Sequence, residues 1–223
     1  MNRMNKNILV IGAGRFGRYT TIQLHNLGHQ IMVIDRDEQR INRILPYASE
    51  ARIGDSTSTT FLRSLGIRNF DLCIVSIGDD LLSSLQTTFA LDELGAKKII
   101  ARATNSRQEK LLLRNGADSV VFPERELGYW TAIRYSSDSI ADYVELSDGY
   151  AIFEVHVPEL WNGLRVGKLN VRRKYHLNIL GVREASRSRD KSEMNMDIHS
   201  DTVLQKGQTL LVLGKKEDVR KIL

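Results

Sequence analysis

The stretch from Asn7 to Asp35 limits most strongly what this chain can fold into. It opens with an apolar run, passes through Gly12, Gly14 and Gly17, and continues as an amphipathic segment. A second apolar run then ends in Asp35. Strand, glycine-rich turn, helix, strand and terminal acid in this order are typical of a nucleotide-binding βαβ unit.

Each glycine has its own physical role in such a unit. Gly12 permits a tight turn, Gly14 lets a phosphate approach the backbone, and Gly17 lets the helix pack closely on the strand. The helix N-terminus offers the phosphate unpaired N–H groups and a partial positive charge. An α/β turn that merely needs glycine is the alternative, but the acid 18 residues after Gly17 favours nucleotide binding.

Asp35 also restricts the kind of nucleotide. A carboxylate at the end of the second strand is placed to accept hydrogen bonds from both ribose hydroxyls. It would repel a 2′-phosphate, so NADP is disfavoured relative to NAD, ATP or ADP.

Composition narrows the class of protein. The 223 residues allow one or two domains, and a hydrophobic content of 42% is that of a globular chain. With no signal peptide and no apolar run near the roughly 18 residues that span a bilayer, we expect a cytoplasmic protein. The net charge of +5 comes from scattered residues, so we expect no nucleic-acid partner. Cys73 is predicted to be a buried hydrophobe rather than a nucleophile.

Residues 1–137 alternate between apolar runs and helical patterns. Strands are expected at 8–11, 31–34, 51–53, 72–77, 98–103 and 119–122. This alternation predicts a Rossmann-like, doubly wound parallel six-stranded sheet, in which ligands lie beyond the carboxyl ends of the strands. The candidate nucleotide-binding residues therefore lie at or beside these ends: Gly12, Gly14, Arg15, Phe16, Gly17, Asp35, Arg36, Asp55, Ser56, Ser76, Ile77, Gly78, Ala101, Arg102 and Glu124.

Residues 138–223 predict a second, small α+β domain. Strands are expected at 144–146, 150–157, 177–182 and 209–213, helices at 169–175 and 215–223, and a loop at 184–196. No catalytic carboxylate pair, metal-ligand cluster or Ser/His/Asp set is evident in it. A dehydrogenase needs a residue that moves a proton near the nicotinamide. The sequence therefore favours a protein that senses a nucleotide over the alternative, an NAD-dependent oxidoreductase.

Taken together, the motifs resemble one known family, the cytoplasmic RCK (regulator of potassium conductance) subunits of bacterial Ktr/Trk potassium uptake systems. The resemblance covers essentially the whole chain. It rests on GAGRFG at 12–17, GDST at 54–57, VSIG at 75–78, NGAD at 115–118, PERELG at 123–128, VRRKY at 171–175 and NILGV at 178–182. GRFG and the PE…G pattern favour the Ktr branch, which senses ATP and ADP, over the Trk branch, which senses NAD(H).

The resemblance implies a gating-ring subunit. Its dimers would assemble into an octameric ring on the cytoplasmic face of a membrane potassium channel subunit, activated by ATP and inactivated by ADP. It also implies a γ-phosphate contact for Arg15, a phosphate or ring contact for Arg102, and a site for Mg²⁺ or another cation at Glu124 in the dimer interface. The alternatives are a solvated arginine at Arg15 and, at Glu124, an acid stabilised by the helix dipole.

The second domain resembles the one that binds cyclic di-AMP in Gram-positive members of the family. The matching positions are Arg172 and Asn178, with Val166 and Ile179 as apolar candidates. A helix-end arginine and a hydrogen-bonded asparagine are the structural alternative. His176 stands where the family usually has a tight turn with glycine, so the geometry of this turn stays open.

Overall fold

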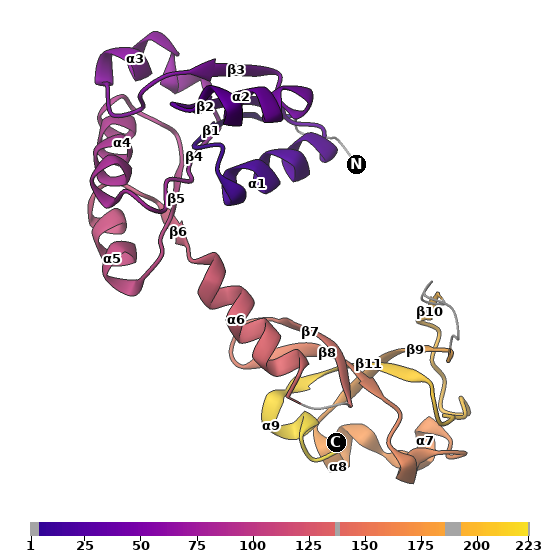
Figure 1. The fold of residues 1–223 in the computed structure, drawn as a ribbon. Helices are drawn as coiled ribbons and strands as arrows, with labels where there is room; N and C mark the ends of the chain where they lie inside the picture. Colours follow the sequence, from indigo (N-terminus) through magenta and orange to yellow (C-terminus); the bar gives the residue numbers. More distant parts are fainter. Residues whose placement is uncertain (1–4, 137–138, 186–192, 223) are drawn as a thin grey trace. The chain divides into compact units, whose positions relative to one another are not determined.

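The structure is a computed structural model that describes residues 5–136, 139–185 and 193–222 (Figure 1). The chain forms two compact units, residues 1–126 and 127–223, which divide within helix α6 (Pro123–Arg134). The domain boundary predicted between residues 137 and 138 lies outside the described residues.

The first unit is the predicted doubly wound sheet. Its six parallel strands lie in the order β3-β2-β1-β4-β5-β6 (Figure 1). The strands are β1 (Asn7–Ile11), β2 (Gln30–Asp35), β3 (Glu50–Ile53), β4 (Leu72–Val75), β5 (Ile99–Arg102) and β6 (Ser119–Val121). The helices are α1 (Arg15–Asn26), α2 (Glu38–Ile44), α3 (Thr59–Ser64), α4 (Leu81–Glu93) and α5 (Ser106–Arg114), with short 3-10 turns at Leu45–Tyr47 and Ile67–Asn69. The order of strands reverses between β1 and β4, which is where such sheets bind ligands.

Alternating side chains on the strands build a core on each face of the sheet. Leu9 of β1 packs in one cluster with Leu62 of α3 and Leu91 of α4. Its neighbour Val10 packs in another with Ile41 and Ile44 of α2. Helices therefore cover both faces of the sheet. The strands have continuous apolar sequences because both of their sides are buried.

Cys73 is completely enclosed in this core, as predicted. Its relative exposure is 1%, and desolvation by burial raises the pKa of the thiol to about 12. Because the thiolate is the reactive form, we expect no reaction of the native protein with a disulfide reagent at pH 8, and rapid reaction in denaturant. The absorbance of released thionitrobenzoate measures both rates. Fast labelling of the native protein would contradict the burial of this strand.

The second unit contains an antiparallel sheet, in the order β10-β9-β11-β8-β7, with short helices (Figure 1). Its strands are β7 (Ile140–Glu145), β8 (Tyr150–His156), β9 (Asn178–Arg183), β10 (Met194–Asn195) and β11 (Thr209–Lys215), and its helices after α6 are α7 (Val166–Leu169), α8 (Val171–Tyr175) and α9 (Lys216–Val219), with a 3-10 turn at Glu159–Trp161. Phe153, Leu177 and Val212 lie at the centre of its core. No helix among the described residues of either unit is long and apolar enough to span a bilayer.

Five predicted elements of this unit need correction. The helix at 169–175 is confirmed only in part: α8 covers Val171–Tyr175, but Asn170 has a φ of 49° and separates α8 from α7, a conformation that asparagine tolerates. The loop at 184–196 was partly wrong, because two of its residues form β10, too short a strand to show periodicity, while 186–192 lie outside the described residues. Strand β7 begins at Ile140, where a register shift hides the alternation. Strand β11 continues to Lys215, which leaves only a short α9.

His176 adopts the left-handed turn that glycine would supply. Its φ is 56° between α8 and β9, and an L side chain is strained there. We therefore expect His176→Gly to raise the free energy of unfolding by about 1 kcal/mol, measured by chemical denaturation. Asn170→Gly is the matched control, because asparagine tolerates this region and the gain should be smaller. A lower stability of His176→Gly would mean that side-chain contacts of the histidine outweigh the strain.

Candidate nucleotide-binding site

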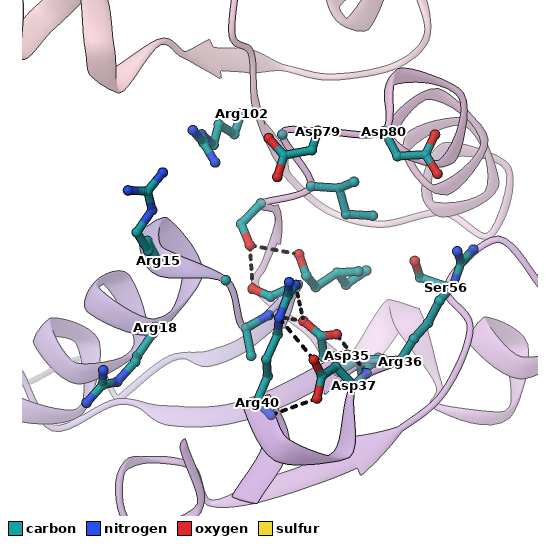
Figure 2. A pocket seen from close by; sticks show the side chains of 18 of the residues that line it. Arg15, Arg18, Asp35, Arg36, Asp37, Arg40, Ser56, Asp79, Asp80 and Arg102 are labelled. Carbon is teal, nitrogen blue, oxygen red and sulfur yellow. Dashed lines mark hydrogen bonds and ion pairs between the residues drawn. The ribbon is translucent and has the colours of Figure 1, made fainter. Parts of the chain in front are cut away.

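A cavity of about 640 Å³ opens at the carboxyl ends of the strands in the first unit (Figure 2). It lies where the strand order reverses, and its volume is that of a small-molecule site. Ten of the predicted residues line it: Gly12, Gly14, Arg15, Asp35, Arg36, Ser56, Ser76, Ile77, Gly78 and Arg102. The structure thus brings together most of the candidates that the strand ends supplied.

The glycine turn is built by close backbone contacts. Gly12 has a φ of 97°, and its N–H donates to the carbonyl of Ile34 at 2.7 Å. A Cβ atom on Gly17 would lie 1.9 Å from the carbonyl oxygen of Gly12, so only glycine fits there. The Ser76 hydroxyl lies within hydrogen-bond distance of the carbonyls of Ile11 (3.0 Å) and Gly12 (2.5 Å), which fixes β4 to the turn.

The N-terminus of α1 differs from those of its neighbours. Side chains of Asp37, Ser58, Asp80 and Asn105 cap α2, α3, α4 and α5. Helix α1 begins after Gly14, has no side-chain cap and has no acid in its first turn. Its first N–H groups therefore lack an internal acceptor at the edge of the pocket, which is the arrangement that binds phosphate at helix N-termini.

Asp35 is buried and firmly held at the end of β2. Its Oδ2 accepts the N–H of Ala13 at 2.6 Å, and its Oδ1 accepts the N–H of Asp37 at 2.9 Å. The Nη1 atom of Arg40 lies 3.6 Å from Oδ2 and compensates part of the charge. Each carboxylate oxygen can accept more than one hydrogen bond, so ribose hydroxyls can still bind to this acid.

Arg102 links the pocket to the first turn of α6. Its Nη2 lies 2.6 Å from Oε1 of Glu124, and its guanidinium lies 5.9 Å from the centre of the Phe16 ring. The backbone N–H of Glu124 itself, and then the guanidinium of Arg102, lower the pKa of this carboxyl. Arg15 and Arg102 lie on the same side of the pocket (Figure 2), so both guanidinium groups can approach one anion.

Five predicted residues do not line the cavity but support it. Gly17 forms the close helix contact, Phe16 lies under Arg102, Ala101 is fully buried in β5, and Asp55 and Glu124 bind Arg36 and Arg102. The sequence did not indicate several other lining residues: Ile11, Arg18, Tyr19, Ile34, Asp37, Arg40, Arg43, Asp79, Asp80 and Ser83. Ile11 and Ile34 lie at the ends of β1 and β2, Arg43 lies in the last turn of α2, and the others lie in the segments that follow β1, β2 and β4. Only these positions could have indicated them.

The described residues contain no cluster of three His, Cys, Asp or Glu side chains that could hold a metal ion. Glu124 stands as a single acid paired with an arginine. A cation at this position would need its other ligands from outside the chain, such as phosphate oxygens.

In the second unit, Arg172 and Asn178 contact each other. The Nε atom of Arg172 donates to Oδ1 of Asn178 at 2.7 Å, across the turn between α8 and β9. Val166 and Ile179 are partly buried against the core of this unit. The four residues matched to a cyclic dinucleotide site thus come from three consecutive elements.

Comparison with known proteins identifies the two units. The family model for the TrkA-N domain matches residues 8–123, and that for the TrkA-C domain matches residues 150–223. The chain is 35% identical to the Ktr system potassium uptake protein C of Bacillus subtilis (strain 168) over 218 residues, which cover 98% of this chain and 96% of that protein. It is 33% identical to protein A of the same system and organism over 217 residues, covering 97% and 95%. The chain belongs to the family of proteins built from TrkA-N and TrkA-C (RCK) domains.

Solved structures share the fold. A crystal structure of the GsuK RCK domain superposes with a TM-score of 0.67 at 21% identity and covers 99% of this chain and 47% of that one. The GsuK channel bound to NAD gives 0.67 at 20% identity, covering 98% and 39%. GsuK bound to ADP gives 0.53 at 20% identity over 62% of this chain and 35% of that one. The two-unit architecture is therefore that of RCK domains.

Proposed function

We propose that this chain is a cytoplasmic, non-catalytic regulatory subunit that senses an adenine nucleotide and controls a membrane potassium channel or transporter of the Ktr/Trk type. The observation that carries the proposal is the uncapped N-terminus of α1 beside the buried Asp35. The helix N-terminus would bind phosphate and the acid would bind ribose, and both line the same cavity. The full-length similarity to two Ktr system potassium uptake proteins supports the regulatory role.

The lining of the pocket favours binding over catalysis. Among the described residues that line it there is no histidine, cysteine or lysine. Of the side chains that commonly transfer protons, the described lining contains only aspartates and Tyr19. An NAD-dependent oxidoreductase therefore remains the weaker alternative, and turnover of NADH with any carbonyl substrate would support it.

Exposed apolar side chains on α4 support self-assembly. Leu82 and Phe89 are 65% and 53% exposed, while Ser84, Thr87 and Leu91 are buried on the opposite side of the helix. Large apolar side chains that gather on the exposed face of a helix mark an interaction surface. We propose that a second copy covers this face and that dimers assemble into an octameric ring beside the channel subunit. Light scattering after size exclusion measures the mass, and a monomer at micromolar concentration would refute the ring.

Two arginines suggest how ATP and ADP are distinguished. Arg15 and Arg102 lie on one side of the pocket, and a γ-phosphate between them would compete with Glu124 for the Arg102 guanidinium. A ligand shifts a conformational equilibrium only through different affinities for the two states. ATP would thus favour the conducting state and ADP the inactive one, with Mg²⁺ or another cation bridging Glu124 and the phosphates.

For Arg15→Ala we expect ATP affinity to fall by about tenfold, the contribution of one charge-assisted hydrogen bond. ADP affinity should change by less than about threefold, because ADP lacks the γ-phosphate. Isothermal titration with both nucleotides on the same preparation measures the difference, with ADP as the internal control. If ATP and ADP affinity fell by the same factor, Arg15 would not contact the γ-phosphate.

The proposed function as a whole is tested by titrating the purified protein with ATP, ADP and NADH, each with and without Mg²⁺. Binding of ATP and ADP in preference to NADH supports the Ktr-type assignment. Preference for NADH would favour the NAD(H)-sensing Trk type instead. Absence of binding to all three nucleotides would refute the nucleotide sensor.

A second ligand is favoured by the contact between Arg172 and Asn178 in the second unit. We propose that cyclic di-AMP binds there and inhibits transport, with Arg172 on a phosphate and Val166 and Ile179 against the base. Titration with cyclic di-AMP should give binding that Arg172→Ala abolishes. Unchanged binding in this variant would leave the pair as a structural contact.

A further inference from the structure

One side of the pocket is formed by an arginine that is held from several directions. Arg36 directly follows Asp35 at the end of β2. Its Nη2 atom lies 2.7 Å from Oδ1 of Asp55, 3.4 Å from the hydroxyl oxygen of Thr57 and 3.4 Å from that of Ser83. These acceptors belong to the loop after β3 and to the first turn of α4, so two separate segments fix the guanidinium.

Asp55 is itself held in place for this contact. Its Oδ1 accepts the N–H of Thr57 at 2.8 Å and the hydroxyl of Thr57 at 2.7 Å. The hydroxyl of Thr57, and then Arg36, lower the pKa of Asp55 to about 2, so the acid is charged at all physiological pH values. A permanently ionised acceptor in a fixed position keeps the guanidinium plane in one orientation.

The position of Arg36 argues against a phosphate contact. Figure 2 shows its guanidinium beside Ser56, on the far side of Asp35 from Arg15 and Arg102. The glycine turn and the α1 N-terminus, where phosphates bind, lie on the side of Arg15. The charge of Arg36 is already compensated by Asp55, but its side chain is 54% exposed and lines the cavity.

We infer that Arg36 is the surface on which the nucleotide base stacks, and that it selects purines over pyrimidines. This inference rests on the proposed nucleotide site, in which Asp35 binds the ribose. The base is bonded to the ribose, so it must lie near Asp35. Arg36 directly follows Asp35 in the sequence. A planar, delocalised guanidinium stacks on aromatic ring faces, which a lysine ammonium cannot do. A purine has a larger ring face than a pyrimidine. Stacking depends on the area of this face and not on the hydrogen-bonding groups at the edge of the base.

The test compares ADP with UDP, which share the ribose and the diphosphate and differ only in the base. We expect the wild-type protein to bind ADP about tenfold more tightly than UDP by isothermal titration. In Arg36→Gln and in Arg36→Lys this ratio should fall to within about twofold, although lysine keeps the charge. Asp55→Asn should reduce the ratio partly, because Asp55 acts by positioning the arginine.

Arg52→Gln is the matched control. Arg52 lies on the neighbouring strand β3, is 46% exposed and also pairs with an acid, Glu50, but it does not line the cavity. The ratio of ADP to UDP affinity should stay at the wild-type value in this variant. Circular dichroism spectra identical to the wild type establish that each variant is folded.

The outcomes separate this inference from the proposed function. If ADP and UDP affinity fell by the same factor in the Arg36 variants, the arginine would act on both ligands through its charge. This result would overturn the stacking role. Wild-type protein that binds both diphosphates equally would overturn the purine selectivity and leave the nucleotide sensor intact. Failure to bind any nucleotide would overturn both.

Discussion

Gly17→Ala should destabilise the first unit by about 3 kcal/mol and abolish nucleotide binding. The added Cβ atom would lie 1.9 Å from the carbonyl oxygen of Gly12 and 2.5 Å from the hydroxyl oxygen of Ser76. The first contact is with backbone, so α1 must move away from β1 or the turn must open. Either movement displaces the N–H groups that are proposed to bind phosphate.

The measurement uses Cys73 as a probe of the first unit alone. Because its thiol is buried, its rate of labelling in increasing denaturant reports the opening of that sheet. Gly128→Ala is the matched control: this glycine lies in α6 with no atom within 4 Å of the added Cβ. Because Gly128 belongs to the second unit, this variant should label at Cys73 at the wild-type rate and bind ADP with wild-type affinity. Wild-type labelling and ADP affinity in Gly17→Ala would refute the close packing of the turn.

Asp35→Ala should lower adenine nucleotide affinity by about 100-fold, because two hydrogen bonds from ribose hydroxyls to a charged acceptor are lost. Asp35→Asn keeps the shape and one acceptor oxygen, so its loss should be smaller, about tenfold. Isothermal titration with ADP measures both values.

Asp35 also accepts the N–H groups of Ala13 and Asp37, so part of any loss could be structural. Titration with 2′-deoxy-ADP separates the two effects. This analogue should bind the wild-type protein more weakly than ADP, and it should bind Asp35→Ala as well as ADP does, because the variant has no acceptor left for the missing hydroxyl. If removal of the 2′-hydroxyl weakened binding equally in both proteins, Asp35 would not contact the 2′-hydroxyl.

The amino-acid sequence by itself determined the architecture of the first unit. Strands β1 and β4 are buried on both faces, so they appear as unbroken apolar runs. Gly12 and Gly17 mark a turn that leaves no room for a Cβ atom. In the second unit local signals were weaker. The sheet there pairs antiparallel strands that are distant in sequence, and a left-handed asparagine or a two-residue strand leaves no periodicity.

The residues of the candidate site divide in the same way. Gly14 and Asp35 follow from spacing along the chain, because one βαβ unit fixes both of them. The hydrogen bonds of Arg36 connect it to both Asp55 and Ser83. The ion pair between Arg102 and Glu124 joins β5 with α6. Such contacts depend on how the strand ends converge at one edge of the sheet. Local pattern determines where a strand ends, but only tertiary packing decides which charged side chains meet there, since side-chain partners across the sheet leave no mark in sequence spacing.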